Sequence, residues 1–133
     1  ESEKTPYNQS HLPVREQTEA VGHAVRAVYL YSAMADCAFE TGDNELKRAS
    51  FALFADIVTK KMYVTGGLGS TPIGEAFTHA YDLPNNDAYA ETCAGIGFMF
   101  FAKRLLRLEN RAEFADVIER VHDYKEISSK FIF

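Results

Sequence analysis

Most of this chain carries apolar residues at the spacing of an α-helix, and that spacing constrains the fold more than any other feature. Between Arg15 and Thr41, apolar side chains fall mostly at helical steps, which predicts one long helix. Gly42 follows and favours the left-handed conformation that ends a helix. A second helix is predicted from about Asn44 to about Met62, with Asp43 as its N-cap.

Two more helices are predicted in the second half of the chain, from about Thr92 to Leu108 and from about Asn110 to about Tyr124. The connection between them is only a few residues long, which makes these helices antiparallel neighbours. No stretch alternates apolar and polar residues convincingly enough to predict a β-strand. The sequence therefore predicts an all-α fold built from antiparallel helical hairpins.

Residues 63–89 interrupt the helical pattern. They hold four of the eight glycines and two of the four prolines of the chain. They also contain several aromatic and aliphatic side chains, so we expect a long structured loop that packs against the helices. Loops of this length inside a compact domain usually carry function.

The third predicted helix is unusually apolar. Residues 94–102 are apolar on most of the helix circumference, and a helix of that kind is buried on nearly all sides. Four helices can hardly surround it that completely. We therefore expect either self-association through exposed apolar helix faces, as in a homo-oligomer, or a larger helical protein of which this chain is a part.

Composition excludes several partners. The chain has 133 residues and a formal net charge of −5, which fits one domain over residues 1–133. It has no basic patch, so no nucleic acid is expected. No apolar run reaches the roughly 18–20 residues of a membrane span, so no membrane is expected either. Two cysteines make no disulfide framework and the N-terminus lacks a signal-peptide pattern, which predicts a cytoplasmic location.

Glu91 and Cys93 lie two residues apart at the start of the apolar run. Within a helix such residues point in nearly opposite directions, so joint binding of an ion requires Glu91 to precede the helix and Cys93 to lie in its first turn. Zinc accepts mixed oxygen and sulfur ligands, but it takes four. The spacing leaves an alternative open, in which Glu91 is a capping residue and Cys93 is a small core side chain.

Glu75 and His23 are two further candidates. Glu75 lies in a glycine-rich stretch with apolar neighbours, where partial burial would suit a general acid, although a loop glutamate in solvent is the simpler interpretation. His23 is predicted to lie within the first helix, where an ordinary core histidine is again the simpler interpretation. Gly22 beside it weakens a helix by about 1 kcal/mol relative to alanine, which indicates a close approach to the backbone there.

Four segments, in order, resemble glycoside hydrolase family 127, the β-L-arabinofuranosidases. They are HLPVREQTEAVGHAVRAVYLYSAMADCA, YVTGGLGS, GEAFTHAYDLPNNDAYAETCAGIGFMFFAKRLL and FADVIERV. The resemblance covers roughly residues 11–121 and leaves 1–10 and 122–133 as divergent ends. It implies that the chain is part of a catalytic (α/α)6 barrel domain, which agrees with the strongly apolar third helix.

The resemblance also implies roles for the four candidate residues. Glu75 would be the general acid/base, Glu91 and Cys93 would be zinc ligands, and His23 would contact the sugar. The implied substrate is a carbohydrate with L-arabinofuranosyl residues, and the implied cofactor is Zn²⁺. The implied reaction is a retaining displacement in which a zinc-bound cysteine thiolate is the nucleophile.

One part of the family pattern is missing. In the family, the nucleophile and two zinc ligands belong to a later Cys-Cys-Pro motif, whereas this sequence has no cysteine after Cys93. We interpret its last residues as a truncation, a frameshift or a divergent end, and expect these residues alone to be inactive. Two alternatives stay open: a non-catalytic helical self-association module, and a zinc site shared by two copies that each supply Glu91 and Cys93.

Overall fold

The computed structural model describes the backbone of residues 4–130 and the side chains of residues 4–123. Four α-helices form the body of this described region: α1 (Ala24–Thr41), α2 (Asn44–Asp56), α3 (Thr92–Leu108) and α4 (Ala112–Lys130). Residues 4–130 contain isolated β-bridges, such as the pair His23 and Ala76, but no strand. The predicted all-α fold is confirmed.

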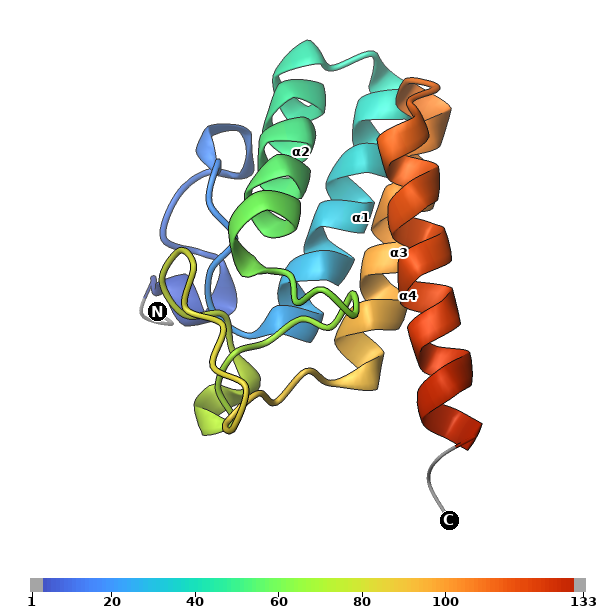
Figure 1. The fold of residues 1–133 in the computed structure, drawn as a ribbon. Coiled ribbons are helices and arrows are strands. Elements are labelled where there is room, and N and C mark those ends of the chain that lie inside the picture. The colour runs from blue at the N-terminus through green and yellow to red at the C-terminus, as the bar shows by residue number, and fades with distance from the viewer. Residues whose placement is uncertain (1–3, 131–133) are drawn as a thin grey trace.

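The helices form two antiparallel hairpins, α1 with α2 and α3 with α4. Helices α1 and α3 run side by side in the same direction and make the most extensive helix contact, while α2 and α4 return beside them (Figure 1). The N-terminal ends of α1 and α3 therefore lie at one end of the molecule. The long loop that follows α2 lies at the same end, which makes this end the place to look for a site.

The connection between α1 and α2 is as predicted. Gly42 adopts φ 69° and its N–H donates to the carbonyl of Ala38, which closes α1. Asp43 caps α2, because its Oδ1 accepts the N–H groups of Glu45 at 2.9 Å and Leu46 at 3.0 Å. Side-chain oxygens at this position satisfy amides that have no partner within the helix.

The predicted start of the first helix at Arg15 is wrong. Helix α1 begins at Ala24, and His23 is its N-cap rather than a residue in its middle. The preceding chain forms a short 3-10 turn, η2 (Val14–Glu16), and then an irregular segment in which Gly22 has φ +73°. Backbone groups of this segment bond to distant parts of the chain instead of to a helical turn, as in the N–H of Phe77 donating to the Gly22 carbonyl at 2.9 Å.

The second predicted helix also ends differently. Helix α2 ends at Asp56 and is followed by a π-helical turn, η3 (Ile57–Lys61). A π-turn is uncommon and changes the direction in which following side chains point. Here it carries the buried Lys61, whose ammonium donates to the carbonyl of Ala20 at 2.6 Å.

Aromatic rings fill the space between the two hairpins. The ring of Phe54 from α2 contacts Phe98 and Phe101 of α3 and Phe114 of α4 at centroid distances of 4.9–6.3 Å. Helix α3 has the predicted bounds, and its small Gly97 lies directly against Val28 of α1. Within residues 4–130, no helix is long and apolar enough to cross a membrane.

The described helices do not surround α3 completely, as its strongly apolar sequence led us to expect. Ile96 is 39% exposed and Phe100 is 44% exposed, and Cys93 lies on the surface as well. Phe100 makes an edge contact with the ring of Tyr29 of α1, which is also exposed. The neighbouring faces of α1 and α3 thus share an apolar surface that the described residues do not cover.

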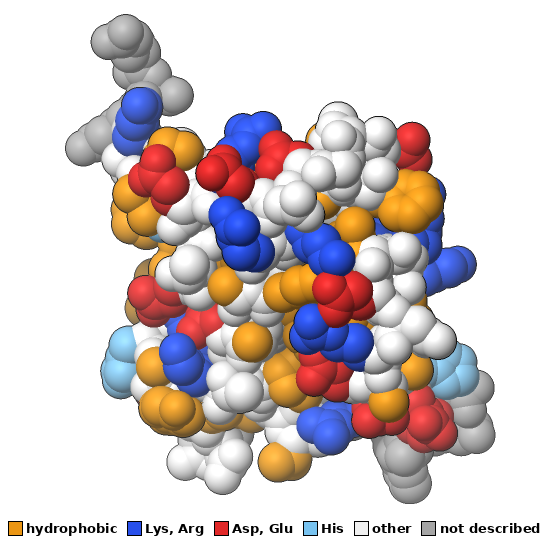
Figure 2. Space-filling model, turned by 90° about the horizontal axis from the view of Figure 1, so that it is seen from above, with side chains coloured by type: hydrophobic (Ala, Val, Ile, Leu, Met, Phe, Trp, Pro, Cys, Tyr) orange, Lys and Arg blue, Asp and Glu red, His pale blue; other side chains and the backbone are white. Residues whose placement is uncertain are grey.

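The opposite end of the molecule has a mixed surface. Seen from above, acidic and basic side chains are interspersed without a large area of one sign (Figure 2). Glu109 after α3 pairs with Lys47 of α2 at 2.8 Å and with Arg111 at 2.5 Å. Such surface pairs contribute little stability.

Candidate functional site

The four candidate residues all lie at the end where α1 and α3 begin. His23 is the N-cap of α1 and Glu91 is the N-cap of α3, with Cys93 in the first turn that follows. Glu75 belongs to a short 3-10 turn, η4 (Ile73–Glu75), in the long loop. Residues far apart in the sequence therefore meet at one end of the hairpins.

His23 and Glu75 are in direct contact. The distance from His23 Nε2 to Glu75 Oε2 is 3.1 Å. His23 Nδ1 accepts the backbone N–H of Arg26 at 3.5 Å, an arrangement that assigns the ring proton to Nε2, where it can be donated to the carboxylate. The Glu75 side chain is 43% exposed and the His23 side chain 15% exposed, so the carboxylate is open to a ligand while the histidine is mostly covered.

Tyr89 holds the other carboxylate oxygen. Its hydroxyl donates to Glu75 Oε1 at 2.9 Å. The pKa of Tyr89 is raised, first by this hydrogen bond and then by burial and by the charges of Glu75, Glu91 and Cys93. Its phenol is therefore a donor at neutral pH, and it lies within electrostatic reach of all three groups. Sequence analysis missed Tyr89 as a site residue; its position two residues before Glu91 was the only available signal.

The backbone is strained on both sides of this hydrogen bond. Glu75 has φ +51° and Ala90 has φ +41°, and a left-handed conformation costs a non-glycine residue roughly 1–2 kcal/mol. The N–H of Ala90 donates to the carbonyl of Gly69 at 2.9 Å, and the N–H of Ala76 donates to that of Thr71 at 3.2 Å. Strain of this kind persists where surrounding contacts fix the chain, and it is frequent at functional sites.

Glu91 and Cys93 occupy the positions along the chain that shared ion binding would require. Glu91 has an extended backbone, with φ −61° and ψ 136°, and precedes the helix. Its side chain makes no capping hydrogen bond, and its Oε2 is buried without a hydrogen-bond partner. Cys93 is exposed. The side chain of Glu91 therefore does not cap α3, and Cys93 lies outside the core of the described residues.

These two side chains fit part of a zinc site. A buried carboxylate oxygen without a partner is costly, and a cation would satisfy it. A thiol in the first turn of a helix has its thiolate favoured by the free amides. Among the residues whose side chains are described, however, no group of three or more His, Cys, Asp or Glu could hold a metal ion. The chain offers two donors there, whereas zinc takes four.

Tyr7 and Gly22 explain how His23 is held. The N–H of His23 donates to the carbonyl of Tyr7 at 3.1 Å, and the two rings meet edge to face with centroids 6.1 Å apart. A Cβ on Gly22 would lie 2.3 Å from the carbonyl oxygen of Pro6. The close approach that the sequence indicated at Gly22 is confirmed, and it comes from the N-terminal segment.

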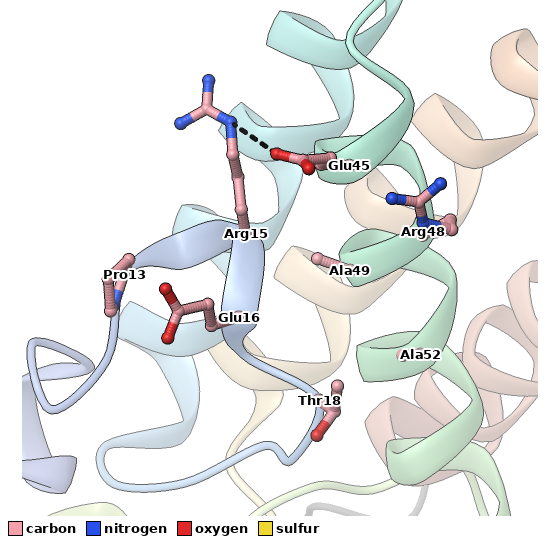
Figure 3. Close-up of a pocket in the computed structure, with 8 residues that line it drawn as sticks. All are labelled: Pro13, Arg15, Glu16, Thr18, Glu45, Arg48, Ala49 and Ala52. Atoms are coloured by element: carbon pink, nitrogen blue, oxygen red, sulfur yellow. Dashed lines mark ion pairs between the residues drawn. The ribbon is translucent and has the colours of Figure 1, made fainter.

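A separate surface pocket lies between η2 and α2 and has a volume of ≈ 460 Å³. Figure 3 shows Arg15 and Glu16 on one side of it and Glu45 and Arg48 on the other. Arg15 pairs with Glu45 at 4.0 Å and with Asp43 at 2.8 Å. None of the four candidate residues lines this pocket, and its Arg15 is already paired with acidic side chains.

Comparison with known proteins identifies the class as glycoside hydrolase. The family model described as "Beta-L-arabinofuranosidase, GH127 catalytic domain" matches residues 2–128. The chain belongs to this family of catalytic domains.

Individual relatives agree with the family match. The chain is 46% identical over 117 residues to a non-reducing end beta-L-arabinofuranosidase of Bifidobacterium longum subsp. longum. It is 52% identical to the crystal structure of a GH127 beta-L-arabinofuranosidase from Geobacillus stearothermophilus T6, with a TM-score of 0.86 over 87% of this chain. A second GH127 beta-arabinofuranosidase structure is also 52% identical, with a TM-score of 0.88 over 91% of this chain.

The relatives are much longer than this chain. It covers 18% of the Bifidobacterium protein and 18% and 19% of the two structures. At more than half sequence identity, the TM-scores show that the two hairpins have the arrangement found in GH127 proteins, as expected for part of a helical barrel. The predicted cytoplasmic location and the roles of individual site residues stay predictions.

Proposed function

We propose that this chain supplies the acid/base side of a glycoside hydrolase site that acts on L-arabinofuranosyl residues. Family membership supports the class of reaction, and the names of the relatives support the sugar. The observation that carries the proposal is the carboxylate of Glu75, partly exposed and held between His23 and Tyr89.

Glu75 would act in two steps of a retaining reaction. It would first donate its proton to the oxygen of the leaving group and later take a proton from the attacking water. His23 Nε2–H lies beside Oε2 at 3.1 Å, so a sugar hydroxyl in the same place could accept from it. His23 would thus orient the sugar next to the oxygen that transfers the proton.

Glu91 and Cys93 would hold a zinc ion together with ligands that lie outside these 133 residues. The unpartnered Oε2 of Glu91 supports this proposal, as does the position of Cys93 at a helix N-terminus. When bound, zinc would keep a coordinating thiol deprotonated at neutral pH. In this proposal the nucleophile also lies outside the 133 residues, so we expect no turnover by these residues alone.

Sugar binding tests the proposal without requiring turnover. Methyl β-L-arabinofuranoside is titrated into the ¹⁵N-labelled chain, and amide signals are followed by NMR. We expect shifts at residues 22–24 and 75–77 that are lost in His23→Ala and weakened in Glu75→Gln, with no shifts from methyl α-D-glucopyranoside. Shifts that are absent, or equal for both sugars, would overturn the proposed site.

A hydrolysis assay on nitrophenyl β-L-arabinofuranoside checks the expected inactivity. No release of nitrophenol is expected from the chain as it stands. Release that is abolished by Glu75→Gln would confirm the acid/base role but would show that the nucleophile lies within these residues.

Metal analysis tests the zinc part separately. The chain is incubated with zinc, freed of unbound metal, and measured for metal content, with Cys37→Ala as the matched control because Cys37 is also exposed. We expect zinc to be retained weakly by the parent chain and by the Cys37 variant, and less by Cys93→Ala. One zinc per two chains would favour a site shared between copies, and equal retention by both variants would contradict any role of Cys93.

A second candidate function is self-association without catalysis. The exposed Ile96 and Phe100 of α3 and Tyr29 of α1 favour it, since they lie on adjoining helix faces. Light scattering at micromolar concentration would detect a dimer that Phe100→Glu dissociates. A monomer at all concentrations would rule this function out.

A further inference from the structure

We propose that Tyr89 is a positioning residue that fixes which oxygen of Glu75 faces the sugar. The inference rests on the proposed role of Glu75 as the acid/base. Its starting point is that the two oxygens of this carboxylate have different partners, contributed by segments that lead into different helices.

Each oxygen of the Glu75 carboxylate contacts a different side chain. Tyr89, three residues before α3, donates to Oε1 at 2.9 Å. His23, at the start of α1, lies 3.1 Å from Oε2. With one oxygen on each side, the plane of the carboxylate is fixed between the two helix entrances. Rotation of the side chain about its last bond would break both contacts.

The two contacts differ in how easily a ligand can replace them. The phenol of Tyr89 has one proton to donate, and Oε1 accepts it. The Nε2–H of His23 can instead be donated to a sugar hydroxyl that binds beside it, which releases Oε2. An oxygen that keeps a hydrogen-bond donor is the less favourable one to protonate. The proton that the acid donates therefore belongs on Oε2, on the side where His23 meets the sugar.

The position of Tyr89 is itself closely determined. The N–H of the next residue, Ala90, donates to the carbonyl of Gly69 at 2.9 Å, although Ala90 is strained at φ +41°. A Cβ on Gly69 would lie 3.9 Å from Cδ1 of Tyr89, so this loop packs against the Tyr89 ring. The loop thus fixes the ring whose hydroxyl meets Glu75.

Tyr89 also connects the two halves of the proposed site. It precedes Glu91 by two residues, in a short irregular segment that leads directly into α3. Any displacement of this segment moves the partner of Glu75 and the side chains of Glu91 and Cys93 together. Tyr89 therefore links the acid/base carboxylate to the segment that carries the residues proposed to bind zinc.

The first measurement is the ¹³C chemical shift of Glu75 Cδ at constant neutral pH, in H₂O and in D₂O. Tyr89→Phe removes only the hydroxyl and should change this shift and reduce its solvent isotope effect. The matched control is Tyr63→Phe, because the Tyr63 hydroxyl lies in the same loop but donates to the carbonyl of Pro84 at 3.1 Å. A Glu75 signal that is unchanged in Tyr89→Phe, or changed equally in Tyr63→Phe, would overturn the inference.

The second measurement is a double-mutant cycle on binding of methyl β-L-arabinofuranoside. Loss of one hydrogen bond should weaken binding by roughly 2- to 10-fold in Tyr89→Phe. If Tyr89 acts through Glu75, the same change should have no further effect in a Glu75→Ala background. Equal effects in both backgrounds would show a general structural role and overturn the inference.

Sugar binding by the variants separates the proposed function from the role of Tyr89. Sugar binding that is indifferent to both His23→Ala and Glu75→Ala overturns the proposed function, and the inference with it. Sugar binding that depends on Glu75 but is indifferent to Tyr89→Phe overturns the inference alone. Should the phenylalanine variant fold poorly, the solvent isotope effect on Glu75 Cδ is measured in His23→Ala instead, which lacks the donor beside Oε2. An effect that persists there supports a donor at Oε1, and its loss would overturn the inference.

Discussion

The ammonium of Lys61 and the carboxylate of Asp56 lie 3.8 Å apart, and both side chains are almost fully buried. Together they hold Ala20 by both of its backbone groups. Its N–H donates to Asp56 Oδ2 at 2.9 Å, and its carbonyl accepts from Lys61 at 2.6 Å. This arrangement fixes the N-terminal segment against the π-turn that follows α2.

Removal of Lys61 should therefore destabilise the fold strongly. Lys61→Ala removes the cation beside the buried Asp56 and the donor to the Ala20 carbonyl, and breaking a buried ion pair costs about 3–5 kcal/mol. The matched control is Lys60→Ala, because Lys60 pairs with the same carboxylate at 3.0 Å but is 41% exposed. Urea unfolding measures both variants, and an equal loss of unfolding free energy in the two would contradict the special position of Lys61.

Gly22 and Gly42 form a second matched pair. Both have left-handed backbones, with φ +73° and +69°, but nothing lies within 4 Å of a Cβ at Gly42. Gly42→Ala should cost about 1–2 kcal/mol from the backbone alone. Gly22→Ala should cost about 1–3 kcal/mol more, because its Cβ would meet the Pro6 carbonyl oxygen at 2.3 Å.

Thermal or urea unfolding distinguishes these two glycines. Gly22→Ala should also shift the NMR signal of the His23 amide. This N–H donates to the carbonyl of Tyr7, the residue that follows Pro6. Equal destabilisation by both variants would show that the N-terminal segment moves aside without cost.

Gly97 lets α1 and α3 approach each other. A Cβ at this position would lie 2.6 Å from Cγ2 of Val28 and 3.2 Å from Cε2 of Tyr29. Gly97→Ala should cost about 1–3 kcal/mol through overpacking, despite the better helix propensity of alanine. In the double variant with Val28→Ala, the losses should be smaller than additive by about 0.5–3 kcal/mol. Strict additivity in urea unfolding would contradict the contact.

Asp43 should make stability depend on pH. Its pKa is lowered, first by the hydrogen bond from the Leu46 amide and then by the Arg15 guanidinium. Because the folded-state pKa is below the unfolded one, the stabilisation is present above the ordinary carboxyl range and is lost as the pH falls through the folded-state value. Asp43→Asn keeps a capping oxygen but cannot titrate.

Thermal unfolding of the parent chain and Asp43→Asn across a pH series tests this. The parent should be the more stable at neutral pH, and the difference should shrink as the pH falls below about 4. A difference that stays constant with pH would show that the Asp43 charge does not contribute.

The sequence pattern predicted helix ends correctly where contacts between neighbouring residues determine them. Helix α3 has the predicted bounds, and Asp43 and Gly42 mark the turn between α1 and α2 because their roles depend on neighbouring amides. The start of α1 was predicted wrongly because Val21 continues the helical spacing of apolar residues. In the structure its carbonyl accepts from the side chain of Gln9 at 2.9 Å instead. Spacing cannot reveal a hydrogen bond to a residue outside the helix.

The site was predictable only in part for a similar reason. Motifs pointed to Glu75, and helix geometry indicated where Glu91 must lie relative to Cys93. The contact between His23 and Glu75 depends on backbone bonds between distant segments, such as the one from Phe77 to Gly22. For Tyr89 the only local signal was its position two residues before Glu91, and a tyrosine in a long loop has many possible partners.

The parallel course of α1 and α3 gives the two ends of the molecule different tolerances to change. One end has tight connections, capped by Gly42 and Asp43, where an insertion would disturb helix packing directly. At the other end the chain enters α1 and α3 through connections that are much longer than the turn between α1 and α2. If a larger domain added more hairpins in this parallel arrangement, every added hairpin would bring one more connecting segment to the same end of the molecule, which we call the rim. Specificity could then change by exchange of rim segments while the helical wall stayed constant.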